Sequence, residues 1–217
     1  MSKIAKGERK ENILNSAERL FAQKGFEGVT VREVTNGAGV DVALVNYYFN
    51  SKRGLFDAVL MRRADVLNKH RMESLAACER EAGDKPLTIE AIIDAYTHPL
   101  LDRSDRGGPG WKSYFSLIAQ VNNSPEWGDI MLPRYFDPIV RRFMEALRKA
   151  LPDSSEENLF WCYHFLSGAL TLTFAETGRI DHLSNGLCKS KDLEAVHARL
   201  VPFVTAGFNA LCNKDNS

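Results

Sequence analysis

The chain has 217 residues, of which 44 % are hydrophobic and 26 % are charged. These proportions match ordinary soluble proteins, so the composition excludes an intrinsically disordered chain and gives no sign of a membrane protein. The formal net charge is zero, but residues 1–70 carry twelve Lys and Arg against eight Asp and Glu, which leaves an acidic remainder. A basic N-terminal segment on an acidic body is expected where one domain meets phosphate groups and the other does not.

The N-terminal residues show no targeting pattern. Segment 1–10 carries charges where a signal peptide needs an apolar stretch, and no segment approaches ~18 uninterrupted apolar residues. We therefore expect a cytoplasmic protein without a membrane partner. The cysteines are widely separated and form no Cys-x-x-Cys pair, which favours free thiols at Cys78, Cys162, Cys188 and Cys212.

The first predicted helix covers residues 8–24. Its apolar residues recur at the spacing of one helical face, and Gly25 follows as a helix-ending glycine. Thr30 and Glu33 then match a capping box, in which the threonine accepts from a backbone amide and the glutamate reaches back to the cap. A second helix is therefore expected over residues 31–38.

A third helix is predicted after a short turn. Gly39 ends the second helix, and Asp41 can cap a helix that runs to about Tyr48. Two short helices joined by a tight, glycine-containing turn have the outline of a helix-turn-helix.

The remainder of the chain also has helical patterns. Ser51 starts a long helix to about Cys78 that would connect a small N-terminal domain to a larger body. The glycine-rich segment 103–110 is predicted to be a mobile loop. Ser154 and Glu157 form a second candidate capping box. Further helices are expected over residues 88–101, 111–121, 132–151, 159–177 and 192–211. Few segments alternate with the period of a strand, so the fold should be all-α.

A stretch of about fifty residues resembles the TetR family of regulators. The residues that carry the resemblance are Ile13-Leu14, Ala17, Leu20-Phe21, Gly25-Phe26, Thr30-Val31-Arg32-Glu33-Val34, Ala38-Gly39-Val40, Tyr48-Phe49, and Ser51-Lys52 before Leu55. The resemblance implies a three-helix DNA-binding domain with a helix-turn-helix, placed at 1–52, and an α-helical ligand-binding and dimerisation domain, placed at 53–217. It also implies a homodimer on a pseudo-palindromic double-stranded DNA operator, most often as a repressor that a small effector releases.

The expected recognition helix departs from the family pattern over residues 41–46, so an operator sequence cannot be carried over. Asn46 is the expected base reader, because its amide can make a bidentate pair with adenine. A solvated helix asparagine is the alternative. Val42, Ala43 and Leu44 match positions that the family directs at DNA and suit contacts with thymine methyl groups, although Leu44 could equally pack in the core.

Five further residues match family positions for contacts with the DNA backbone. Tyr47 and Tyr48 carry hydroxyls that can reach phosphate oxygens, with a purely structural aromatic pair as the alternative. Thr30 and Arg32 lie at the start of the second helix and Lys52 at the start of the fourth, where helix N-terminal amides also favour phosphate.

The body is predicted to contain an apolar cavity for a largely hydrophobic effector, entered through the loop 103–110. The expected lining residues are aromatic or aliphatic: Trp111, Phe115, Ile118, Phe136, Phe143, Trp161 and Phe165. A solid core is the alternative. The sets Leu159-Phe160-Trp161, His164-Phe165 and Pro202-Phe203 are similar to TetR-like regulators linked to fatty-acid metabolism, which makes fatty acids and acyl thioesters the candidate effectors.

No spacing of acidic residues, histidines or serines builds a catalytic dyad, a triad or a metal site, so we expect neither an enzyme nor a cofactor. The helices 159–177 and 192–211 carry small residues within apolar stretches and are expected to form the dimer seam: Gly168, Ala169, Ala206 and Gly207. The alternative function is a helical protein–protein interaction module without a ligand switch.

Overall fold

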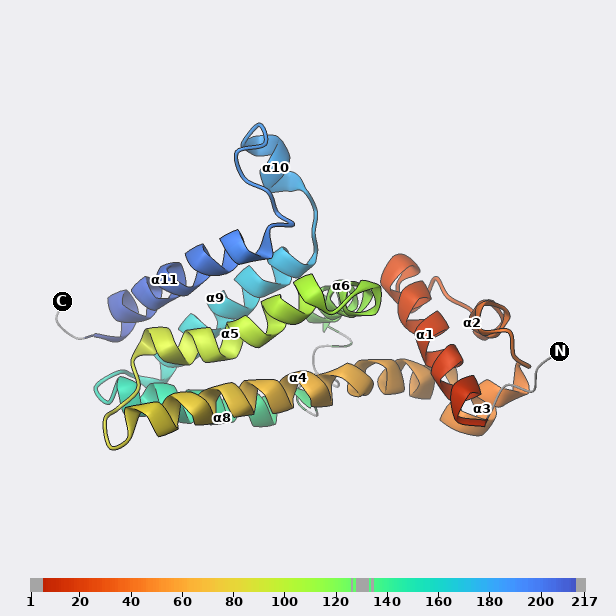
Figure 1. The fold of residues 1–217 in the computed structure, drawn as a ribbon, viewed down its shortest axis with the longest axis horizontal. Coiled ribbons are helices and arrows are strands. Elements are labelled where there is room, and N and C mark those ends of the chain that lie inside the picture. Colours follow the sequence, from red (N-terminus) through yellow and green to blue (C-terminus); the bar gives the residue numbers. More distant parts are fainter. Residues whose placement is uncertain (1–5, 126, 128–132, 134, 214–217) are drawn as a thin grey trace.

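The computed structural model describes residues 6–125, 127, 133 and 135–213, and every regular element among them is an α-helix (Figure 1). The predicted all-α fold is confirmed. Three short helices form a unit at one end: α1 (Lys6–Lys24), α2 (Val31–Ala38) and α3 (Ala43–Phe49). The longest helix, α4 (Lys52–Ala82), starts in this unit and runs the length of the body.

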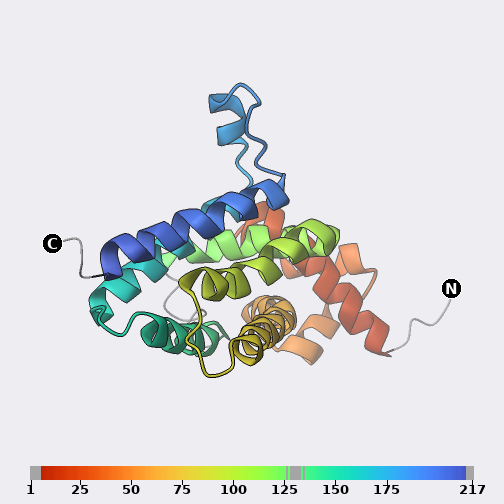
Figure 2. The same ribbon diagram turned by 60° about the vertical axis from the view of Figure 1, so that its left-hand side comes forward.

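The body is built of helices laid along α4. Helix α5 packs against both α4 and α11, and α9 lies between α6 and α11. Figure 2, turned by 60°, shows α11 on the opposite side of the body from α4. The bounds of the body helices are α5 (Ile89–Arg106), α6 (Pro109–Asn122), α8 (Asp137–Ala150), α9 (Glu156–Phe174), α10 (Arg179–Leu183) and α11 (Leu193–Cys212).

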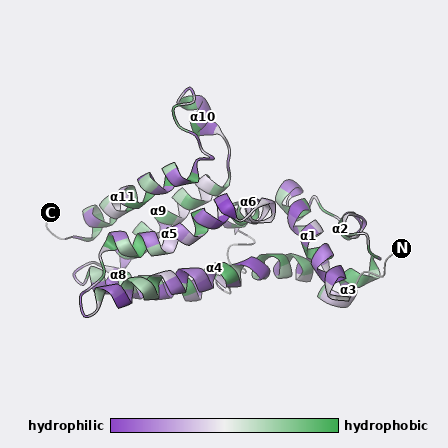
Figure 3. Ribbon diagram, in the orientation of Figure 1, coloured by the Kyte–Doolittle hydropathy of each residue, from purple (hydrophilic) through white to green (hydrophobic). Residues whose placement is uncertain are grey.

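Hydrophobic and hydrophilic segments alternate along α4 (Figure 3), as expected for a helix with one buried side. Its buried residues include Leu55 and Phe56 near its start and Leu67 and Leu75 further along. The Phe56 ring lies 5.1 Å from both the Phe21 and Phe26 rings, measured between centroids. The first turns of α4 therefore belong to the core of the N-terminal unit, and the later turns to the core of the body.

The predicted local signals of the first three helices are present. Thr30 and Glu33 form the capping box of α2. Gly25 has a φ of 69° and Gly39 a φ of 65°, the left-handed region in which a glycine costs little. The second predicted capping box is not formed, because Ser155 caps α9 by accepting from Asn158 N and Glu157 therefore does not lie at the third helical position.

The predicted mobile loop 103–110 is wrong. Helix α5 continues through Arg106, and α6 already begins at Pro109, so only Gly107 and Gly108 connect them. Gly108 has a φ of 84°, and a Cβ at Gly107 would lie 2.4 Å from Trp111 Cδ1. The glycines make a tight turn possible, so this segment is not a flexible entrance to the body.

Other elements also differ from the prediction, among them α9, which covers Glu156–Phe174 and not 159–177. Helix α4 extends four residues beyond Cys78, to Ala82. The helix predicted over 132–151 begins at Asp137, with Pro138 in its first turn, and residues 132 and 134 lie outside the described residues. The short helix α10 had no predicted counterpart, and it projects from the body between α9 and α11 (Figure 1).

Candidate DNA interface and effector pocket

The turn between α2 and α3 is fixed by hydrogen bonds. The amide of Gly39 donates to Asn36 O, and that of Val40 donates to Thr35 O over 3.1 Å. At the other side of the turn, Asp41 Oδ1 accepts from Ala43 N over 2.8 Å, although the N-cap residue of α3 is Val42 and not the predicted Asp41. The two helices thus have the connection of a helix-turn-helix.

Helix α3 has one buried and one exposed face. Val45 and Phe49 are buried in the core of the N-terminal unit. Val42 is 45 % exposed and Tyr47 is 64 % exposed. The exposed face also carries Ala43 and Asn46.

Among the predicted DNA-contacting residues, Leu44, Tyr48 and Lys52 are less exposed than the others. Leu44 and Tyr48 are half-buried and pack against the core. The ring of Tyr48 lies 4.9 Å from that of Tyr47. Leu44 therefore has the packing role that was its alternative, whereas Tyr47 faces outward.

Three more of the predicted residues lie at the starts of two other helices, α2 and α4. The backbone N–H and the hydroxyl of Thr30 each donate to Glu33 Oε2 over 2.8 Å, and Lys24 Nζ donates to Glu33 Oε1 over 2.7 Å. These hydrogen bonds, that of Lys24 first, lower the pKa of Glu33 to about 2. Arg32 is exposed. Lys52, in the first turn of α4, lies with Nζ 4.2 Å from the centre of the Phe26 ring.

A buried ion cluster joins the N-terminal unit to the body. Glu18 of α1 is only 2 % exposed. Its carboxylate accepts from Arg62 Nη2 over 2.7 Å and from Arg63 Nε and Nη2 over 2.6 and 2.7 Å. Arg62 also donates to Asn15. Because both arginines belong to α4, this cluster fixes α1 to the long helix.

Helix α6 makes a second connection to α1. Gln120 Nε2 donates to Ala22 O over 2.8 Å. The Arg63 guanidinium lies 4.7 Å from the ring centre of Trp111, which is buried in α6. Helices α4 and α6 therefore attach α1, and with it the N-terminal unit, to the body.

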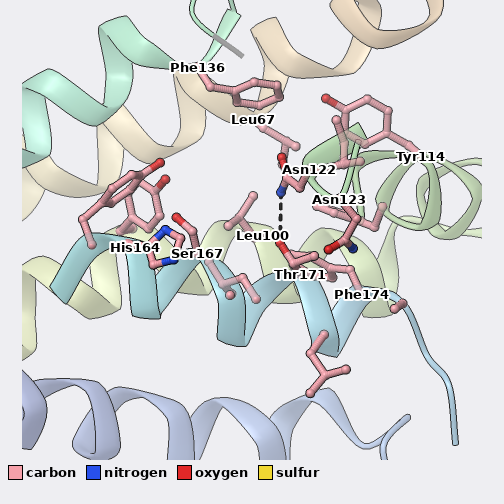
Figure 4. A pocket seen from close by; sticks show the side chains of 18 of the residues that line it. Leu67, Leu100, Tyr114, Asn122, Asn123, Phe136, His164, Ser167, Thr171 and Phe174 are labelled. Atoms are coloured by element: carbon pink, nitrogen blue, oxygen red, sulfur yellow. Dashed lines mark hydrogen bonds between the residues drawn. The ribbon is translucent and has the colours of Figure 1, made fainter. Parts of the chain in front are cut away.

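The same two helices form part of the wall of a cavity of about 670 Å³ in the body (Figure 4). This volume is in the range that holds small organic ligands. Helix α4 contributes Leu67 and Arg71, and α6 contributes Tyr114 and Phe115. On the α9 side, Thr171 Oγ1 accepts from Asn122 Nδ2 over 3.0 Å, the dashed line in Figure 4.

Three of the seven predicted lining residues line this cavity: Phe115, Ile118 and Phe136. The other four do not. Trp111 packs against Arg63 at the junction, the region where α1 meets α4 and α6. Phe143 is buried, with its ring 4.9 Å from that of Tyr96.

Trp161 and Phe165 lie on the outside of the molecule. They are 50 % and 58 % exposed, with their rings stacked on each other. The prediction placed them inward because α9 is apolar on more than one side, and such a pattern does not say which side faces the body.

The sequence prediction missed the polar lining residues. Arg71 is 4 % exposed and Tyr114 is fully buried, and both border the cavity. Burial raises the pKa of Tyr114. Tyr96 and Tyr163 line the same region. A lone arginine in a long helix resembles a solvated surface residue, so no sequence signal marked Arg71.

Exposed apolar side chains also form a continuous face on α9. Trp161, Phe165 and Leu172 are all at least half exposed, and together with Gly168 they follow the spacing of one helical side. On α11, Phe203 is 75 % exposed. Among the described helices, only α11 is long and apolar enough to cross a membrane, and 28 % of that stretch is buried.

Two family models match the chain. Residues 13–59 match the model described as bacterial regulatory proteins, tetR family. Residues 94–207, more than half of the chain, match the tetracyclin repressor-like C-terminal domain. A helix-turn-helix unit on a helical body defines a DNA-binding transcriptional regulator, and this chain belongs to the TetR family.

Relatives and solved structures agree with that assignment. The chain is 48 % identical over 91 residues to the probable HTH-type transcriptional regulator YttP of Bacillus subtilis, which covers 41 % of this chain and 44 % of YttP. It is 23 % identical over 117 residues to IcaR of Staphylococcus aureus, a negative transcriptional regulator of the biofilm operon icaADBC, covering 54 % and 55 %. The chain thus spans about half the length of these two relatives.

A crystal structure of a putative TetR family regulator from Shewanella sp. PV-4 has a TM-score of 0.66 to this chain at 16 % identity. It covers 95 % of this chain and 99 % of that one. At this identity the likeness concerns the fold.

Proposed function

We propose that the chain is a repressor that binds a pseudo-palindromic operator as a homodimer and leaves DNA when an apolar small molecule enters the body. One observation supports this most directly. Helices α4 and α6 line the cavity and also hold α1 through Glu18 and Ala22. A ligand that moves either helix changes the position of the DNA-binding unit. IcaR, a relative over half its length, is a negative regulator.

Base recognition is assigned to the exposed face of α3. Asn46 can form a bidentate pair with adenine, while Val42 and Ala43 can meet thymine methyl groups. Tyr47 and Arg32 are exposed and suit phosphate oxygens. Thr30, Tyr48 and Lys52 are proposed to contact the DNA backbone. Leu44 contributes less to base recognition, because its side chain is half-buried.

Two variants separate base recognition from phosphate contact. Asn46→Ala should weaken binding to the cognate site and relax base preference, because a base-edge contact is lost. Lys52→Ala should weaken binding to all sequences and reduce the salt slope by about one unit per lost phosphate contact. Lys69→Ala, a highly exposed lysine further along α4, is the matched control and should change neither. An unchanged base preference in Asn46→Ala contradicts the assignment.

Dimerisation is assigned to the exposed apolar faces of α9 and α11. Phe165 and Phe203 would be buried between two copies, where a stable interface removes about 800 Å² per partner from water. A two-fold dimer also matches an operator with two half-sites. Phe203→Asp should give a monomer by light scattering and lose operator binding. Val66→Asp, an exposed apolar position on α4, is the control and should remain dimeric.

The effector switch is tested by measuring operator affinity in the presence of candidate ligands, beginning with fatty acids and acyl thioesters. A coupling of about 1–3 kcal/mol, or roughly 5–150-fold in operator affinity, is expected for an effector. Ligands that raise the melting temperature without changing operator affinity support the alternative of a helical interaction module without a switch. A dimer that binds no DNA supports that alternative as well.

A further inference from the structure

We infer that the ligand of the cavity carries an anionic group, such as a carboxylate, that pairs with Arg71, while an apolar body fills the rest. This inference rests on the proposed function of the cavity as an effector site. Arg71 is only 4 % exposed and borders the cavity. Arginine stays protonated in proteins, so this group is a buried positive charge.

The charge of Arg71 has no carboxylate partner among the described residues. Its Nε donates to Tyr96 O over 3.1 Å, and its guanidinium carbon lies 4.0 Å from the centre of the Tyr96 ring. Asp137 borders the same cavity but forms no ion pair with Arg71. A buried charge without an opposite charge costs several kcal/mol, so a site that keeps one is prepared for an anion.

The hydroxyl of Tyr114 supports the same conclusion. This side chain is fully buried, and its oxygen has no hydrogen-bond partner. Tyr114 and Arg71 line the same cavity. A carboxylate oxygen could accept from both the guanidinium and the phenol, which would satisfy two groups at once. Phe115, Ile118 and Phe136 offer an apolar wall beyond this polar end.

The test compares an acid with its uncharged analogue in binding measured without DNA. Decanoate, methyl decanoate and decanol are titrated by calorimetry against the full-length protein and against Arg71→Met. Decanoate should bind the wild-type protein at least tenfold more tightly than the ester or the alcohol. In Arg71→Met the acid should fall to the affinity of the ester, whose own affinity should not change.

Controls separate this inference from the proposed function. Arg80→Met, an exposed arginine of the same helix, should bind decanoate as the wild type does. Acetate and inorganic phosphate test whether a small anion alone suffices, and tight binding of either overturns the inference. Equal affinity for acid and ester, or no binding of the acid, also overturns it. If the acid binds through Arg71 but leaves operator affinity unchanged, the switch fails and the inference stands.

A separate observation concerns the outside of the body, where α5 and α11 pack together. We propose that Asp94, His98 and His197 form a site for a divalent transition metal, with Zn²⁺ as its natural probe. Asp94 and His98 lie one turn apart on α5, and His197 comes from α11. Their ligand atoms all lie within 4.8 Å of one another.

The distances fit a tetrahedral ion with few adjustments. Asp94 Oδ1 lies 2.9 Å from His197 Nε2 and 4.0 Å from His98 Nδ1. With zinc bonds of about 2.0–2.2 Å, neighbouring ligand atoms lie roughly 3.4 Å apart, between these two values. His197 Nε2 is shielded from solvent and makes no hydrogen bond despite its short distance to the carboxylate. Two imidazoles and one carboxylate are a ligand set typical of Zn²⁺ and related ions.

Metal binding is measured on the Cys188→Ser protein, which removes the exposed thiol as a competing ligand. One Zn²⁺ should bind per chain by calorimetry, and Co²⁺ should give the visible absorption of a tetrahedral complex. Asp94→Asn and His197→Ala should each weaken binding at least tenfold, whereas His70→Ala should not. Mg²⁺ should not compete. A wild-type stoichiometry that persists in both His197→Ala and Asp94→Asn overturns this proposal.

Discussion

Two buried charges in neighbouring parts of the molecule differ in whether an opposite charge lies beside them. At the junction, Glu18 is matched by two arginines of α4 that supply three hydrogen bonds. In the body, Arg71 of the same helix is as well buried but faces a cavity with no carboxylate partner among the described residues. The first arrangement holds two parts of the protein together. The second leaves a buried charge that we propose a ligand matches.

The largest effect is expected at the matched charge. Glu18→Gln leaves the partly buried Arg63 without a carboxylate, and leaves Arg62 with only the exposed Glu11, because the amide is neutral. Removing one partner of a buried ion pair costs about 3–5 kcal/mol. Urea denaturation should show this loss in the free energy of unfolding. A change below about 1 kcal/mol would contradict the role of Glu18 as the junction.

The same experiment on the unmatched charge should give a different result. Arg71→Met replaces a buried cation by an apolar side chain of similar length. The free energy of unfolding of the ligand-free protein should stay within about 1 kcal/mol of wild type or rise, because no ion pair is broken. A fall as large as that of Glu18→Gln would mean that Arg71 is a structural residue, which would remove the contrast between the two sites.

A smaller gain is expected from Tyr114→Phe. Its hydroxyl is buried without a partner, so removing it relieves a desolvation cost of about 1 kcal/mol. The variant should melt at a higher temperature in the absence of ligand and bind decanoate more weakly than wild type. A lower melting temperature would show that the hydroxyl has a partner in the folded protein.

The smallest effect is expected at the exposed capping box of α2, where neither Glu33 nor its partner Lys24 is buried. The pKa of Glu33 is about 2 in the folded protein, below its ordinary value of 4.5. A lowered folded-state pKa contributes stability above pH 4.5, and this contribution is lost as the pH falls towards 2. Glu33→Gln should therefore flatten the acid limb of the stability profile. A profile unchanged by this substitution contradicts the capping role.

The N-terminal unit could be predicted from the sequence because its signals are local. Thr30, Glu33 and Gly39 act on residues within four positions of themselves and occupy the positions that the sequence indicates, whereas Asp41 lies one residue before the N-cap Val42. The prediction for segment 103–110 was wrong because its glycines were interpreted as a sign of flexibility. Gly107 is required instead because the nearby Trp111 ring leaves no room for a Cβ.

The cavity could be predicted only in part because its wall depends on tertiary contacts. Phe115 and Ile118 were found from the inward side of an amphipathic helix. The orientation of α9 could not be found, because that helix is apolar on more than one side. Arg71 and the cluster of His98 with His197 depend on which helices meet, and His197 lies far along the chain from its neighbours.

The unbroken length of α4 has a mechanical consequence. Arg71 lies nineteen residues after Lys52 in one helix, which places them about 28 Å apart along its axis. A tilt of roughly 5° at Arg71 would displace the start of α4 by about 2.5 Å over that length. In the proposed dimer, the two copies would present their α3 helices about 34 Å apart to meet successive turns of the major groove. A displacement of this size in each copy, doubled across the two-fold axis, would change that spacing by about 5 Å.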